Sequence, residues 1–130
     1  MKVLVVEDNV YQKKLMCNIL SKLGYEVMAA SDGVEMLEII LSDSDIGLVI
    51  TDIDMPYLDG IAAANIAKRH VCDRVIPIIA VTGLSDYKEI EKVALESFDA
   101  VIQKPVDIST LTRLINLKLN LFLGESNDKD

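Results

Sequence analysis

Short apolar segments alternate with amphipathic segments along almost the whole chain. Five apolar segments read as strands: Lys2–Val6, Glu26–Ala30, Leu48–Thr51, Val75–Val81 and Ala100–Ile102. The first, third and fourth lack polar alternation, which is typical of parallel strands covered by helices on both faces. Because the intervening segments have helical spacing, the pattern predicts an α/β protein with a five-stranded parallel sheet, (βα)5.

Apolar stripes and capping residues mark the helices. The first helix has Met16, Ile19, Leu20 and Leu23, with Gly24 as its stop, and the last has Ile108, Leu111, Ile115, Leu119 and Phe122. We predict Asn9 as the first N-cap, with Gln12 as its return partner three residues on. Asp86 and Asp107 are expected to cap the fourth and fifth helices.

Composition restricts the class of protein. The 130 residues, 51% hydrophobic and 26% charged, suit one globular domain, predicted over residues 1–122, with a disordered tail over residues 123–130. A net charge of −8 argues against direct binding of nucleic acid or an anionic membrane surface. No apolar run approaches the ~18 residues of a membrane helix, and Glu7 and Asp8 interrupt any signal peptide. Cys17 and Cys72 are expected to be free thiols, so a cytoplasmic protein is the working prediction.

Polar residues follow the predicted strands where a doubly wound sheet forms its site. Glu7 and Asp8 follow the first strand, Asp52 ends the third, and Thr82 and Lys104 follow the fourth and fifth. In a flavodoxin-like sheet of order 2-1-3-4-5, the first and third strands are neighbours at the switch point. We therefore expect all five residues to converge on one edge of the sheet.

The chemistry of this set favours phosphoryl transfer. Close carboxylates repel one another unless a cation neutralises them, and oxygen ligands suit Mg²⁺, with Mn²⁺ as the alternative ion. Lys104 can hold a phosphoryl oxygen and the Thr82 hydroxyl can donate to another, while Gly83 leaves the approach open. Asp52 is then the candidate nucleophile.

The motifs VLVVEDN, DIDMPYLDG, AVTG and QKP occur in this order. Together they resemble the receiver domain of two-component response regulators, the CheY-like superfamily, up to about residue 122. The resemblance implies a signalling switch that is not an enzyme on outside substrates. It implies partners of two kinds: a histidine kinase or histidine phosphotransfer protein as phosphodonor, and an effector domain or downstream protein. A homodimer that forms on phosphorylation is left open.

The resemblance also implies a role for each matching residue. Asp52 corresponds to the phosphoacceptor, and Glu7 and Asp8 to the metal-binding acidic pair. Asp54 would contribute its backbone carbonyl to the metal. Thr82 and Lys104 correspond to the residues that respond to the phosphoryl group. Near the site, the resemblance implies structural roles for three residues: Pro56, Gly60 and Pro105, the last after a cis peptide bond.

Two positions depart from the family pattern. Val101 stands where an aromatic switch residue is usual, and its short side chain cannot swing as a ring does. Ser97 and Phe98 replace a common Gly-Ala turn, and Phe98 is expected to add exposed aromatic surface near the output face, which the family forms from the fourth helix, fifth strand and fifth helix.

Three alternatives stay open. Asp52 and Asp54 also match the DxD of haloacid-dehalogenase-type phosphatases, although Pro56 departs from that motif. A degenerate receiver would bind partners without phosphorylation. Glu7 or Asp8 can also serve as an acid at the start of the first helix.

Overall fold

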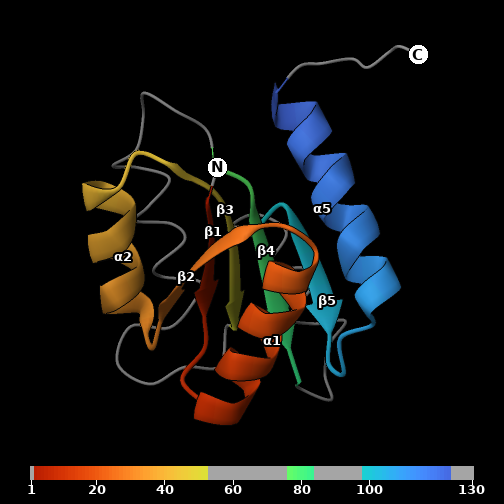
Figure 1. Cartoon of the computed structure of the whole chain (residues 1–130), viewed down its shortest axis with the longest axis horizontal. Coiled ribbons are helices and arrows are strands. Elements are labelled where there is room, and N and C mark those ends of the chain that lie inside the picture. The colour runs from red at the N-terminus through yellow and green to blue at the C-terminus, as the bar shows by residue number, and fades with distance from the viewer. Residues whose placement is uncertain (1, 53–75, 84–97, 124–130) are drawn as a thin grey trace.

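The predicted alternation of strands and helices is present in the computed structural model, which describes residues 2–52, 76–83 and 98–123 (Figure 1). In chain order the elements are β1 (Lys2–Val6), α1 (Val10–Lys22), β2 (Glu26–Ala30), α2 (Gly33–Ser42), β3 (Ile46–Asp52), β4 (Ile78–Thr82), β5 (Ala100–Gln103) and α5 (Ile108–Leu123). The other predicted helices, with the cap Asp86 and with Cys72, lie outside the described residues. Leu123 belongs to α5, and the rest of the predicted tail, residues 124–130, lies outside the described residues.

The strands form one parallel sheet of order β2-β1-β3-β4-β5, which confirms the predicted doubly wound topology. β1, β3 and β4 occupy its middle, and nearly all their residues are buried. Their sequences lack polar alternation because apolar side chains pack on both faces of the sheet.

Two apolar clusters lie on opposite faces of the sheet. α2 contributes Met36 and Ile40 to the first cluster. α1 contributes Leu20 to the second, and α5 contributes Leu111 and Ile115. In Figure 1, α2 accordingly stands on one side of the sheet, while α1 and α5 cover the other. Successive strand residues alternate between the two clusters, except at the start of β3, where an irregularity in its pairing with β1 places Ile46 and Leu48 in different clusters.

Asn9 caps α1 as predicted, but the return bond of the capping box is not formed. Asn9 Oδ1 accepts a hydrogen bond from the Gln12 N–H at 3.0 Å. The Asn9 N–H instead donates to Glu7 Oε2 at 3.1 Å, so Glu7 is the acid at the start of this helix. The predicted return bond from the Asn9 N–H to the Gln12 side chain was therefore wrong. The Gln12 side-chain oxygen accepts a hydrogen bond from Lys104 instead.

Gly24 ends α1 as predicted. Its φ of +100° lies in the left-handed region that favours glycine. The Gly24 N–H donates to the Ser21 carbonyl at 3.0 Å and the Tyr25 N–H to the Leu20 carbonyl at 3.1 Å, which together make a Schellman motif. Asp107 caps α5 by accepting from the Thr110 N–H at 3.0 Å, also as predicted.

Three expectations need correction. β3 is longer than predicted at both ends. β4 begins only at Ile78, so Ile76 and Pro77, which were predicted to belong to the strand, lie before it. Ile108 is 48% exposed and stands outside the α5 stripe that Leu111 and Ile115 continue. Phe98 is not an exposed aromatic: it is 3% exposed and packs in the cluster that α2 covers.

Candidate functional site

The carboxyl ends of the strands meet at one edge of the sheet. The last pair of β1 and β3 is Val6 with Thr51, so the next residues, Glu7 and Asp52, lie beside each other at the ends of these strands. β4 pairs with β5 through Thr82 and Gln103, directly before Lys104. Because the strands pair regularly up to their carboxyl ends, side chains far apart in the sequence come together there, as the topology predicted.

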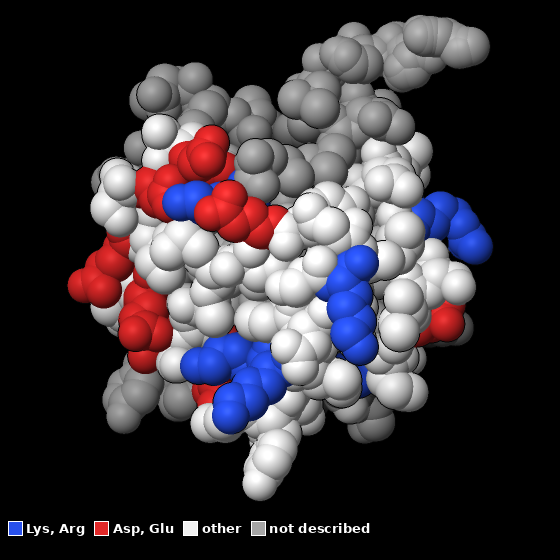
Figure 2. Space-filling view, viewed as in Figure 1, with Lys and Arg blue, Asp and Glu red and all other residues white. Residues whose placement is uncertain are grey.

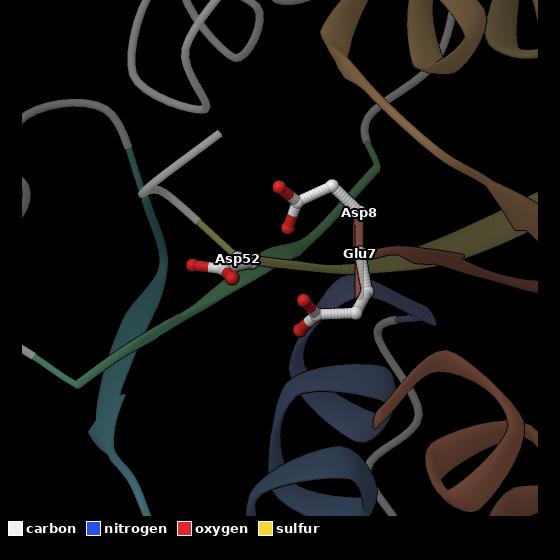
Figure 3. A group of neighbouring side chains, drawn as sticks. All are labelled: Glu7, Asp8 and Asp52. Atoms are coloured by element: carbon white, nitrogen blue, oxygen red, sulfur yellow. The ribbon is translucent and has the colours of Figure 1, made fainter. Parts of the chain in front are cut away.

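Glu7, Asp8 and Asp52 form a cluster of carboxylates, with one carboxylate oxygen from each within 4.8 Å of the others. Glu7 and Asp8 extend from the end of β1 towards Asp52 at the end of β3 (Figure 3). Asp52 is 5% exposed and Glu7 8% exposed, whereas Asp8 is exposed to solvent. Two buried carboxylates and one carboxylate exposed to solvent suit a hard divalent cation such as Mg²⁺.

Lys104 lies against the two buried acids. Its Nζ is 3.2 Å from Asp52 Oδ2 and 3.6 Å from Glu7 Oε1. It also donates a hydrogen bond to Gln12 Oε1 at 2.9 Å. Burial lowers the pKa of Lys104, but the attraction of Asp52 and Glu7 outweighs burial and leaves this pKa above its ordinary value of 10.5. The lysine is therefore a permanent positive charge beside the cluster.

Glu7 is the carboxylate whose ionisation the site changes most clearly. Burial, together with the negative charge of Asp52, raises the pKa of Glu7 from its ordinary value of 4.5 to about 7. The hydrogen bond from the Asn9 N–H and the charge of Lys104 act in the opposite direction without offsetting this effect. Glu7 thus keeps its proton to a much higher pH than an ordinary glutamate does.

A cavity of about 460 Å³ opens beside the carboxylates. Its apolar walls come mainly from α1, the ends of the central strands and the segment after β5; among them are Leu15, Met16 and Val106. Its polar lining includes Glu7, Gln12, Asp52 and Lys104. The acids are therefore reached along a largely apolar passage between α1 and the segment after β5, which can admit a side chain or a small molecule.

The structure places the remaining predicted residues around this cluster. Thr82 is fully buried at the end of β4. Because side chains alternate along a strand, Thr82 points to the same face of the sheet as Ile78 and Ala80, opposite to Val81. A Cβ at Gly83 would lie 3.6 Å from Lys104 Cδ. Glycine thus leaves free a space that any larger side chain would partly fill.

The peptide bond between Lys104 and Pro105 is cis, as the resemblance implied. Val101 is half-buried and packs against the cluster that α2 covers. Asp54, Pro56 and Gly60 lie outside the described residues.

Gln12 is the residue at the site that the sequence did not reveal. It was expected to act locally at the start of α1, but its side chain contacts Lys104, 92 residues away in the sequence. The only available signal was its place one helical turn after the acidic pair. That signal does not distinguish a capping residue from one that faces the site.

Comparisons with known proteins agree with this geometry. The family model of the response regulator receiver domain matches residues 3–116. Chemotaxis protein CheY1 of Helicobacter pylori is 33% identical over 129 residues, covering 98% of this chain and 100% of that protein. The sensor histidine kinase RcsC of Escherichia coli is 29% identical over 117 residues, covering 90% of this chain. The chain spans only 12% of the length of that kinase.

A solved structure resembles the whole fold. The response regulator protein TrrA from Thermotoga maritima, in complex with Mg(2+)-BeF, is 29% identical with a TM-score of 0.79, covering 91% of this chain and 97% of that one. In the part of the chain that the structure describes, no helix is long and apolar enough to cross a membrane. The chain belongs to the response regulator receiver domain family, a family of two-component signalling modules and not of catalytic enzymes, which excludes the phosphatase alternative.

Proposed function

We propose that the chain is a phosphoacceptor switch in which Asp52 takes a phosphoryl group from a phosphohistidine. The observation that carries this proposal is the position of Asp52. Its carboxylate is buried at a strand end, within 4.8 Å of oxygens from Glu7 and Asp8 and 3.2 Å from the Lys104 ammonium. A buried carboxylate between an acidic pair and a fixed cation suits attack on phosphorus better than a structural role.

Mg²⁺ is the proposed cofactor, with Mn²⁺ as a substitute. Glu7, Asp8 and Asp52 would hold it, together with the backbone carbonyl of Asp54. The donor set fits, because these ligands are all oxygen atoms and one of the carboxylates is open to water. When bound, the ion would neutralise the carboxylates and coordinate an oxygen of the phosphoryl group. The TrrA complex with Mg(2+)-BeF supports this choice of metal.

The residues of the chain have distinct parts in the proposed transfer. An Asp52 carboxylate oxygen forms the new bond to phosphorus while the bond from phosphorus to the histidine nitrogen breaks. The leaving nitrogen keeps the electron pair and takes a proton from solvent. Lys104 holds a second phosphoryl oxygen as a point charge, and the Thr82 hydroxyl donates to a third after moving toward the new group. The space beside Gly83 admits the phosphoryl group.

The phosphodonor is proposed to be a histidine kinase or a histidine phosphotransfer protein. Tyr11 is 85% exposed and Leu15 61% exposed, and they are neighbours at i and i+4 on α1. Leu15 also lines the cavity that leads to Asp52. Figure 2 shows a broad uncharged area on the face that α1 covers, with basic side chains gathered over the lower part of that helix. A donor protein that packs on this apolar surface would place its phosphohistidine at the mouth of the cavity.

The output surface is proposed to be the family one, formed by the fourth helix, β5 and α5. Only β5 and α5 fall within the described residues. Phosphorylation would bias this surface between two states and so change the binding of an effector domain or a downstream protein. Because Val101 stands where the family usually has an aromatic residue, this change of state would take place without an aromatic side chain that changes its rotamer there.

Replacement of the acceptor tests the proposal. Wild-type protein, incubated with phosphoramidate and Mg²⁺, should gain one phosphoryl group in its intact mass, and Asp52→Asn should gain none. Asp45→Asn is the matched control, because Asp45 is an exposed acid before β3, at the opposite end of that strand. Labelling of Asp52→Asn at the wild-type level would show that the acceptor is another residue.

A further inference from the structure

Lys104 makes its shortest polar contact with an uncharged group. The hydrogen bond from Lys104 Nζ to Gln12 Oε1 is 2.9 Å long, against 3.2 Å to Asp52 and 3.6 Å to Glu7. An ammonium group has three N–H donors, and these three oxygens can occupy all of them. Gln12 is therefore a third partner of the lysine beside the two acids.

The backbone of Gln12 is held in place at the start of its own helix. The Gln12 N–H donates to Asn9 Oδ1 at 3.0 Å, which fixes residue 12 in the first turn of α1. Its side chain then reaches Lys104 across the cavity lining that also contains Asp52. The contact thus joins α1 to the segment after β5 at the point where a phosphoryl group would enter.

The three partners of Lys104 differ in what a divalent cation would do to them. Glu7 and Asp52 are proposed ligands of the ion, so a bound cation would draw their charge away from the lysine. The cation would also repel the ammonium group directly. The Gln12 carbonyl carries no net charge and is not among the proposed ligands. Of the three contacts, it is the one that a bound cation would not draw away from the lysine.

We propose that Gln12 is a positioning residue that keeps the Lys104 ammonium beside Asp52 when the metal is bound. This inference rests on the proposed function, because it assigns Lys104 to the incoming phosphoryl group. Without the Gln12 carbonyl, the lysine side chain has to be ordered at each phosphorylation event. The rate of transfer then falls, although Gln12 touches neither the phosphoryl group nor the metal.

The test uses Gln12→Met, which keeps an unbranched side chain of similar length and removes the carbonyl acceptor. With Mg²⁺-loaded protein and phosphoramidate, the second-order rate constant of phosphorylation should fall about fivefold, which is about 1 kcal/mol at 1.36 kcal/mol for each factor of ten. Lys104→Met should reduce it further. In the Lys104→Met background, Gln12→Met should have no additional effect, because Gln12 acts only through the lysine. Gln12 is exposed, so the variant should fold, and thermal unfolding checks this.

Each outcome separates this inference from the function on which it rests. If Asp52→Asn is unlabelled but Gln12→Met reacts at the wild-type rate, the role of Gln12 is wrong and the phosphoacceptor role stands. An equal fivefold loss in both backgrounds would overturn the positioning role, since Gln12 would then act without Lys104. If Asp52→Asn is labelled as wild type is, both proposals fall together.

Discussion

Magnesium should bind the carboxylate cluster more weakly as the pH falls, because the ion has to displace a proton from Glu7. The pKa of Glu7 is raised to about 7 by burial and by Asp52, so Glu7 is charged above this pH and protonated below it. Between about pH 8 and about pH 5.5, a group with this pKa passes from almost fully charged to about 3% charged. The apparent dissociation constant of Mg²⁺ should therefore rise about thirtyfold over this interval, with about sixteenfold of the rise between pH 7 and pH 5.5.

Isothermal titration calorimetry at several pH values measures this dependence directly. Repeating the titration in buffers of different ionisation enthalpy counts the protons released for each ion bound. About one proton should be released at acidic pH and almost none near pH 8. Glu7→Gln is the matched variant, because it keeps the shape of the side chain and carries no proton to displace. It should bind Mg²⁺ more weakly, and its dissociation constant should change much less with pH.

A dissociation constant of the wild type that is the same at both ends of the interval would refute this reasoning. So would a Glu7→Gln variant that keeps the full thirtyfold dependence, because the displaced proton would then belong to another group. Circular dichroism at each pH verifies that the fold is intact, so that a loss of binding is not a loss of structure.

Two further predictions concern the scaffold, both measured by urea denaturation. Gly24→Ala should lower the free energy of unfolding by about 1–2 kcal/mol, because the left-handed backbone there disfavours a Cβ while nothing lies within 4 Å to clash with it; an unchanged midpoint would contradict this. Ile115→Ala should cost about 2–5 kcal/mol because Ile115 is fully buried, whereas Leu117→Ala, at a position 51% exposed on the same helix, should stay within about 0.5 kcal/mol. If the two variants lost equal amounts of unfolding free energy, the face of α5 that packs on the sheet would not be the one that contains Ile115.

The sheet and the convergence of the site were predictable because they depend on local patterns and on the rules of parallel sheets. Continuous apolar segments identify buried strands, and the strand order then determines which strand ends are neighbours. Glu7, Asp52 and Lys104 needed no more information than their places at the ends of such strands. Their contacts in the structure follow from the register.

The predictions that were wrong concern side chains whose environment depends on tertiary contacts, and such contacts leave no periodic pattern in the sequence. Phe98 is a single aromatic residue before a strand, and only its packing against a cluster built from other segments shows that it is buried. Ile108 has the right helical spacing but stands in the first turn of α5, where its side chain remains exposed. The contact of Gln12 with Lys104 joins opposite ends of the chain, so no local pattern distinguishes it from a helix cap.

The charges of the site suggest how a metal-free receiver keeps three carboxylates together. Lys104 contributes one positive charge, and the proton that Glu7 retains near neutral pH removes a negative charge from the cluster. These two effects together compensate part of the charge that one divalent ion would. Binding of Mg²⁺ would then displace the proton of Glu7 and weaken the attraction of the two acids for Lys104. The hydrogen bond from Lys104 to the uncharged Gln12 carbonyl would still hold the lysine near Asp52.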